Sequence, residues 1–230
     1  MRTCPQMGSD SLSDAINIFF LVFAGLFPIV NPVGNAPIFY NFTRGCQPAT
    51  RRMLARRIAL GGFLLLLGSL FIGSHVLVFF GITLPVVRIA GGLVVTSMGW
   101  NLLNAGETPI ESQSTPGVGD QTALERSFYP LTMPLTVGPG SIATAITLGS
   151  QKGIAASGFG YLALQGAAAI VGLCAVSLTI YLSYRYADKI EQFLGKTGTS
   201  VLIRLSAFIL LCIGVQILWN GVSELFKLSY

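Results

Sequence analysis

Two short stretches of the chain carry the residues from which a binding site can be built. The first runs from Phe27 to Pro37 and the second from Tyr129 to Ser141. Each has two prolines four positions apart, followed by a glycine and a further proline, inside an otherwise apolar segment. A proline lacks an N–H and leaves the carbonyl four residues earlier without its helical donor. Helix breaks are therefore predicted at these prolines: Pro28, Pro32, Pro37, Pro130, Pro134 and Pro139.

The chemistry offered by these breaks suits a zwitterion. Asn35 is expected to cap a half-helix that starts at Ala36, and Ser141 to cap a half-helix that runs to Ser150. Free N–H groups and the positive dipole end of a half-helix attract a carboxylate, while freed carbonyls attract an ammonium group. The predicted substrate-binding residues are Asn31, Gly34, Asn35, Thr132, Thr136, Gly138, Gly140, Ser141, Asn101 and Gln216.

A plainer interpretation of the same residues stays open. Glycine and proline are common in membrane helices, and small residues allow helices to pack closely. Two breaks in matching positions favour a site, because paired interruptions point to the binding site in transporters. The amides and threonines either line that site or bond neighbouring helices.

Other kinds of chemistry have little support in the sequence. We find no nucleophile–base pair, metal-ligand set or phosphate-binding loop, so an enzyme, a cofactor and a metal site are not expected. The four cysteines are scattered without a metal or redox spacing. No apolar span has an aspartate or glutamate near its centre, which argues against a carboxylate proton relay. His75 is interpreted as a structural residue, although a histidine can take part in proton coupling.

The composition places the two stretches in a membrane. Of the 230 residues 52% are hydrophobic and 10% charged, whereas soluble domains have about 25% charged residues. We expect an all-α polytopic protein, because each apolar span has roughly the 20 residues that a membrane-crossing helix needs. The six predicted spans are 16–42, 58–80, 86–104, 127–149, 157–183 and 201–223.

The distribution of lysine and arginine predicts the orientation. Arginines crowd the first linker, Thr43 to Arg57, and further basic residues lie in the third and fifth linkers. Cytoplasmic loops carry an excess of these residues, so these three linkers are expected inside and both termini outside. The net charge of +5 is thereby explained without a nucleic acid partner. Residues 1–14 lack the basic start and cleavage pattern of a signal peptide.

The chain also repeats itself. Span three has Arg88 near its start and then Gly99-Trp100-Asn101, and span six has Arg204 and then Gly214-Val215-Gln216. Both arginines are interpreted as anchors that reach the interface. Spans one to three match spans four to six, and an odd number of spans inverts the second copy. The predicted domains are a first repeat, 1–104, a cytoplasmic linker, 105–126, and a second repeat, 127–230, with spans one and four broken.

Three segments in combination carry a family resemblance: Asn31 to Pro37, Pro134 to Ser141, and the Arg-x-x-Gly segment at Arg88. With them the chain resembles the MarC family of membrane proteins from about Leu12 to Leu225. The resemblance implies a six-span relative of the LysE-type exporters in the prokaryotic cytoplasmic (inner) membrane. The family includes transporters of small neutral amino acids such as glycine and alanine.

The expected function is secondary transport of a small zwitterionic amino acid by alternating access around the two breaks. A passive pore or a non-transporting membrane scaffold is one alternative, and an exporter of drugs or other metabolites is another. The expected partners are the amino acid and the lipid bilayer. The sequence also allows a homo-oligomer. It leaves open the substrate, the direction of transport and any coupling ion.

Overall fold

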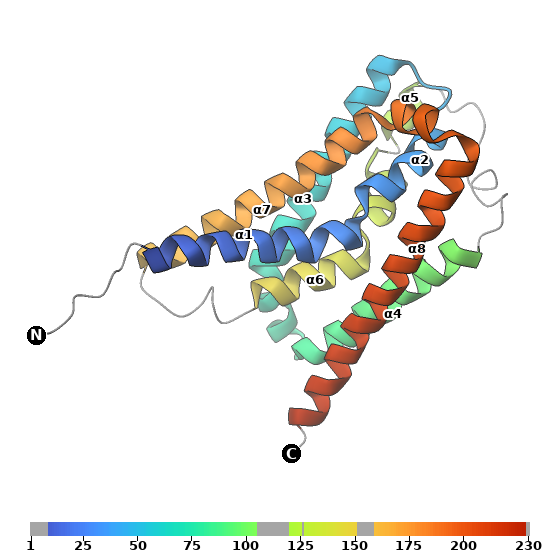
Figure 1. The fold of residues 1–230 in the computed structure, drawn as a ribbon. Coiled ribbons are helices and arrows are strands. Elements are labelled where there is room, and N and C mark those ends of the chain that lie inside the picture. The colour runs from blue at the N-terminus through green and yellow to red at the C-terminus, as the bar shows by residue number, and fades with distance from the viewer. Residues whose placement is uncertain (1–8, 105–119, 126, 151–158, 229–230) are drawn as a thin grey trace, which may run out of the picture.

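The structure, a computed structural model, describes residues 9–104, 120–125, 127–150 and 159–228, and these form helices without a β-strand (Figure 1). The elements are α1 (Ser9–Val30), α2 (Pro32–Phe42), α3 (Pro48–Phe79), α4 (Leu84–Asn104), α5 (Asp120–Glu125), η1 (Ser127–Thr136), α6 (Pro139–Gly149), α7 (Phe159–Arg185) and α8 (Ala187–Leu228). Helices α2, α3 and α6 each begin with a proline. The first helical position suits proline because the N–H there has no intrahelical acceptor.

Five helical segments of the described chain are long and apolar enough to cross a membrane: Ser13–Phe42, Pro48–Phe79, Leu84–Asn104, Ala163–Arg185 and Thr197–Lys227. The first of these joins α1 and α2. The pair formed by η1 and α6 makes a sixth span if it is counted as one, although it is bent by 66°. The described part of the chain is therefore all-helical, and its five or six candidate spans indicate a multi-pass membrane protein.

Two of the predicted linkers, residues 43–57 and 184–200, are largely helical. Helix α3 begins at Pro48, which places most of the arginines of the first basic linker on its first turns. Helix α8 begins at Ala187 and turns sharply at Gly195, which has a positive φ of 64°. Lysine and arginine are good helix formers, so a membrane helix continues readily into a basic segment. The predictions for 105–119, Arg126 and 151–158 lie outside the described residues.

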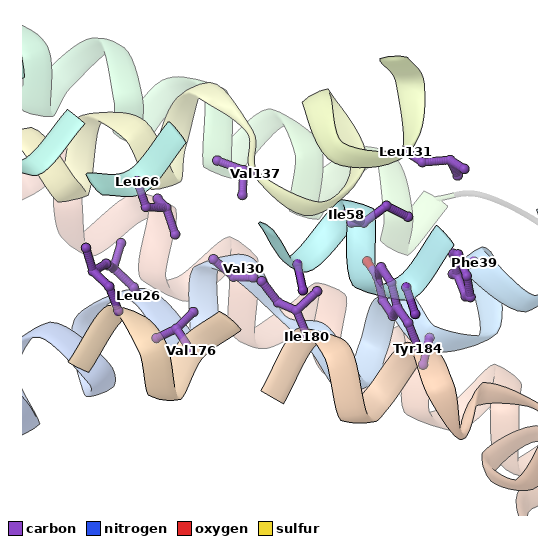
Figure 2. Close-up of a cluster of buried hydrophobic side chains, with 14 of the residues drawn as sticks. Leu26, Val30, Phe39, Ile58, Leu66, Leu131, Val137, Val176, Ile180 and Tyr184 are labelled. Carbon is purple, nitrogen blue, oxygen red and sulfur yellow. The ribbon is translucent and has the colours of Figure 1, made fainter. Parts of the chain in front are cut away.

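Helices α1, α3, α6 and α7 form a bundle with an apolar core, to which α2, α5 and η1 add further side chains (Figure 2). Leu26 of α1, Leu66 of α3 and Val176 of α7 are among its fully buried members. At one end of this core the ring of Phe39 in α2 stacks on Tyr184 of α7, with centroids 4.5 Å apart and planes 6° from parallel. Side-chain packing therefore holds these elements together.

Helices α4 and α8 form a second body that pairs through backbone rather than large side chains. A Cβ added to Gly99 would lie 2.6 Å from the Leu211 nitrogen, and one added to Gly214 would lie 2.5 Å from the Thr96 nitrogen. Small residues allow membrane helices to approach this closely. The pair contacts the bundle chiefly where α8 meets α2 and where α4 meets α6.

An ion pair joins the start of α4 to the end of α8. The guanidinium of Arg88, near the start of α4, bonds the carboxylate of Glu224, near the end of α8. Arg88 was expected to act as an anchor that reaches the membrane interface, and the structure adds a carboxylate partner to it near the same helix end. Because the two helices meet so closely, the basic side chain finds a carboxylate on its neighbour. Arg204 is exposed on α8.

Candidate binding site between two helix interruptions

The interruption between α1 and α2 is one residue wide. Helix α1 ends at Val30, α2 begins at Pro32, and Asn31 between them has left-handed backbone angles (φ 48°, ψ 55°). Asparagine adopts this conformation more readily than most residues. Its Oδ1 then caps α2 by accepting a hydrogen bond from the Gly34 N–H at 3.2 Å. The cap is thus Asn31, and the expectation that Asn35 caps a later helix start is wrong.

Asn35 instead bridges the two interruptions. Its Nδ2 donates to the carbonyl of Val30 at 2.9 Å and to the carbonyl of Leu135 at 3.1 Å. In an unbroken helix the Val30 carbonyl would accept from the N–H of Gly34, but that N–H is turned toward Asn31. One nearly buried amide therefore satisfies a carbonyl freed by the first interruption and ties it to the second.

The second interruption is wider. Tyr129 and Met133 have extended backbone angles within η1, and Gly138 is extended (φ −94°, ψ 174°) just before α6 begins at Pro139. Ser141 was expected to cap this helix, and that expectation is wrong. Because the helix starts at proline, the serine occupies its third position, and its Oγ donates back to the Gly138 carbonyl at 2.8 Å. No side chain caps α6.

Two threonines bond the backbone within η1. The Oγ1 of Thr132 and the Oγ1 of Thr136 each donate to the carbonyl five residues earlier, at 2.7 Å. Thr136 also pairs with the hydroxyl of Tyr184 at 2.8 Å. Since the threonine proton is directed to a carbonyl, the tyrosine is the donor in this pair. Tyr184 of α7 therefore holds η1 through its hydroxyl and α2 through its ring (Figure 2).

A cavity of about 510 Å³ lies between the two interruptions and the α4–α8 pair. None of the residues that line it is charged, and most are apolar. The interruptions supply Ile29, Asn31, Asn35, Ile38, Phe42, Pro134, Leu135, Thr136, Gly138, Gly140 and Ser141, and the α4–α8 pair supplies Val95, Met98, Asn101, Leu102 and Leu210. At the N-terminus of α6, the first-turn N–H groups of Gly140 and Ser141 have no acceptor inside their helix.

Seven of the ten predicted substrate-binding residues line this cavity: Asn31, Asn35, Thr136, Gly138, Gly140, Ser141 and Asn101. The other three do not. Gly34 faces the side chains of Asn31 and Ser206, and Thr132 lies against Gly61 of α3. Gln216 is exposed on α8 and bonds Asn220 at 2.9 Å, so the repeat partner of Asn101 is turned away from the cavity.

The six prolines predicted to break helices have different positions in the structure. Pro32 and Pro139 begin helices, Pro130 lies within η1, and Pro134 lines the cavity. Pro28 lies inside α1 and Pro37 inside α2, so the predicted breaks at these two positions are wrong. A proline inside a membrane helix is tolerated where neighbouring groups satisfy the freed carbonyl.

Sequence reasoning missed the apolar wall of the cavity and the role of Tyr184. Val95, Met98 and Leu102 have the spacing of one helical face. This spacing does not single out a cavity-lining face in the sequence, because the other faces of the same span are equally apolar. Tyr184 near the end of its span resembled an interfacial tyrosine, and nothing in the sequence pairs it with Thr136. His75 is exposed on α3 and does not line the cavity.

Comparison with known proteins decides the family. The model of the MarC family of integral membrane proteins matches residues 16–226. The chain belongs to the MarC family. The UPF0056 membrane protein YvbG of Bacillus subtilis is 34% identical over 206 residues, which cover 89% of this chain and 94% of that protein.

Two further relatives in the MarC family are similar over nearly their whole length. The UPF0056 inner membrane protein MarC of Citrobacter koseri is 32% identical, with 88% of this chain and 92% of that protein covered. The UPF0056 membrane protein YhcE of Escherichia coli is 30% identical, with 91% and 94% covered. No solved structure matches the chain significantly.

Proposed function

We propose that the protein is a secondary transporter of small neutral amino acids, of the glycine and alanine type, which it binds between its two helix interruptions. The observation that carries the proposal is the uncapped start of α6, where Gly138, Gly140 and Ser141 line an uncharged cavity. Helix N-termini bind carboxylates. Asn35 and Asn101 line the same cavity, and an amide oxygen can accept a hydrogen bond from an ammonium group.

An inverted-topology repeat would provide the alternating access. Gly99 packs on Leu211 and Gly214 packs on Thr96. In the sequence repeat Gly99 corresponds to Gly214, and the residues three positions earlier, Thr96 and Leu211, correspond as well. A reciprocal contact of this kind is expected at a two-fold axis. The contacts of α2 with α8 and of α6 with α4 correspond in the same way. Rocking of the α4–α8 pair against the bundle would then expose the cavity to either side.

The orientation that we propose has both termini outside the cytoplasm. The basic residues at the start of α3 and at the α7–α8 junction border one common pocket, and Arg44 pairs with Glu191 across the same region. One end of the molecule therefore gathers cations from two predicted inside linkers. Cysteines introduced at Arg52 and Arg56 should resist an impermeant thiol reagent added from outside. Labelling of those sites in intact cells would contradict this orientation.

Transport itself is tested with labelled glycine and alanine in proteoliposomes. Saturable, stereoselective uptake is expected, whereas a passive pore would give neither. The repeat offers a matched pair of variants. Asn101→Ala should raise KM because its amide lines the cavity, and Gln216→Ala should leave KM unchanged because its amide does not. Absence of saturable flux and of binding for every small amino acid would refute the proposal.

One observation favours a second candidate, an exporter of larger apolar metabolites or drugs. The cavity volume of about 510 Å³ falls within the range of roughly 300–1,000 Å³ typical of sites for drug-sized ligands. Its wall is also mostly apolar. Competition of labelled alanine uptake by leucine, phenylalanine and a hydrophobic drug panel separates the two candidates, because only the second predicts that the largest solutes compete best.

A further inference from the structure

A second, smaller pocket lies apart from the transport cavity and shares none of its lining residues. It has a volume of about 110 Å³ and sits where the start of α3 meets the junction of α7 and α8. Four of its lining side chains are cationic and one is a carboxylate: Arg51, Arg52, Arg185, Lys189 and Asp188, with Pro48 and Tyr186 completing the wall. The pocket therefore concentrates positive charge from three helices.

Two of these cations, Arg51 and Arg185, form hydrogen bonds with neutral groups. Arg51 donates to the hydroxyl and the carbonyl of Thr43, at 3.2 and 3.0 Å, and its guanidinium lies 4.7 Å from the Tyr40 ring centre. Arg185 bonds the Tyr181 hydroxyl at 2.7 Å. Hydroxyls, carbonyls and rings fix the direction of a cationic side chain without cancelling its charge.

The remaining charges strengthen the positive potential. Lys189 lies 5.4 Å from the Tyr186 ring centre, and Arg185 lies 5.6 Å from the same ring. The nearby carboxylate of Glu191 pairs with Arg44, which lies outside the pocket. The positive dipole end of α3 also begins here, at Pro48. The carboxylate of Asp120, which does not line the pocket, accepts a hydrogen bond from the Gln47 N–H at 3.1 Å and offsets part of that dipole. Among the lining residues Asp188 is the single acid against four cations.

The position of the pocket indicates the source of the anion. The long apolar helix α3 begins at the pocket and the long apolar helix α7 ends at it. In a membrane the pocket therefore lies at headgroup depth. Tyrosines are enriched at that depth. Tyr186 lines the pocket, and the rings of Tyr40 and Tyr181 lie close to its arginines Arg51 and Arg185. Apolar side chains exposed beside it, such as Met53 and Leu182, offer a surface for acyl chains.

We propose that this pocket binds the phosphate group of an anionic phospholipid headgroup. Basic pockets between membrane helices on the cytoplasmic side bind such headgroups. The volume corresponds to a few water molecules, which is room for one phosphate group. The lipid would join α3 to the α7–α8 junction at a point where these elements otherwise bring like charges together. This site is independent of the transport cavity and of its substrate.

The test measures lipid retention and thermal stability of the purified full-length chain in detergent. Phosphatidylglycerol, phosphatidylcholine and inorganic phosphate are the probes. Phosphatidylglycerol should be retained and should raise the melting temperature, and phosphatidylcholine should not. Stabilisation by inorganic phosphate alone, with displacement of phosphatidylglycerol, would assign the same pocket to free phosphate rather than lipid.

Two double variants test whether the lipid binds in this pocket. Arg52→Gln with Lys189→Gln removes two exposed cations that carry none of the hydrogen bonds described above. This pair should weaken phosphatidylglycerol binding by roughly 30-fold, since each basic residue near an anionic headgroup contributes about fivefold. Arg56→Gln with Arg57→Gln removes the same charge from the same end of the molecule, outside the pocket, and should change binding little. Equal loss in both double variants, or no preference for phosphatidylglycerol, would overturn the proposal.

Discussion

The two helix interruptions have similar sequences but different local structures. At the first, one left-handed residue separates two helices, and Asn31 and Asn35 satisfy the backbone groups that the break exposes. At the second, extended residues are spread along η1, and α6 starts at Pro139, directly after the extended Gly138, without a side-chain cap. The first interruption is therefore closed by its own side chains, while the second leaves N–H groups open to the cavity. On this difference we propose that the carboxylate of a substrate would bind at the second interruption.

The largest effect is expected from Gly138→Val. The backbone angles of Gly138 suit any residue, and an added Cβ lies 3.3 Å from the Pro134 carbonyl oxygen and 3.7 Å from the Met98 sulfur. The side chain would therefore occupy the space at the start of α6, and the Pro134 carbonyl would have to shift by a few tenths of an ångström. Amino acid flux in proteoliposomes should fall to the level of protein-free vesicles, with normal membrane insertion and a melting temperature lowered only slightly.

Two other glycines bear on the design of that experiment. Gly68→Val is the matched control, because a Cβ there meets no other atom within 4 Å, and this variant should transport normally. Gly140 is unsuitable, since an added Cβ would overlap the side chain of Val95 and disturb the contact of α6 with α4. Normal substrate affinity in Gly138→Val would show that the second interruption does not hold the ligand.

The next largest effect is expected from Asn35→Ala. The variant loses one buried and one partly buried hydrogen bond, which removes the Asn35 donor from the carbonyls of Val30 and Leu135. An unsatisfied buried polar group costs about 1–3 kcal/mol, so the expected loss of unfolding free energy is about 2–5 kcal/mol. Reversible unfolding in mixed detergent measures it. Asn101→Ala, an amide in the same cavity that makes no such bridge, should cost less than about 1 kcal/mol. Equal losses would mean that Asn35 does not tie the interruptions together.

A comparison of Asn31→Ala with Asn31→Gly separates the two contributions of the first interruption. Alanine loses the cap, at about 1 kcal/mol, and must hold a left-handed conformation, at roughly 1–2 kcal/mol. Glycine adopts that conformation freely and costs only a few tenths of a kcal/mol as a cap. The glycine variant should therefore melt higher than the alanine variant in detergent. The reverse order would contradict the left-handed assignment of Asn31.

The smallest effect is expected from Ser141→Ala. The hydroxyl bonds only the Gly138 carbonyl and does not cap α6, so the helix start and its N–H groups remain. Stability should fall by at most about 1 kcal/mol, and the KM for alanine should change no more than a few-fold. A KM rise of the size caused by blocking the cavity would give the serine hydroxyl itself a direct role in binding.

The sequence predicted the helical membrane class and most of the polar residues of the cavity, because both depend on local features. Apolar length predicts spans, and the Pro-Gly clusters located the region in which Asn31, Thr136 and Gly138 meet. The capping residues were predicted wrongly at both interruptions. Because α2 and α6 each begin with a proline, both helices start earlier than predicted. Asn35 and Ser141 therefore lie inside these helices and cannot cap them.

Other features depend on which faces of the helices meet, and that information is not local. Asn101 and Gln216 are equivalent in the sequence, yet only Asn101 lines the cavity. Asn35 is bonded to a carbonyl one hundred residues away. The glycines of α4 and α8 indicated close packing, but only the structure pairs Gly99 with Leu211 and Gly214 with Thr96.

The uncharged wall of the cavity has an electrical consequence. A charge that crosses a membrane exchanges about 2.3 kcal/mol with each 100 mV of potential. A zwitterion has no net charge, and no ionisable side chain lines the cavity that would hold it. A solute that moves alone by this route therefore gains nothing from the membrane voltage. Its net flux would follow its own concentration gradient and reverse when that gradient reverses, so the same protein would release an amino acid from a loaded cell and admit it to a depleted one.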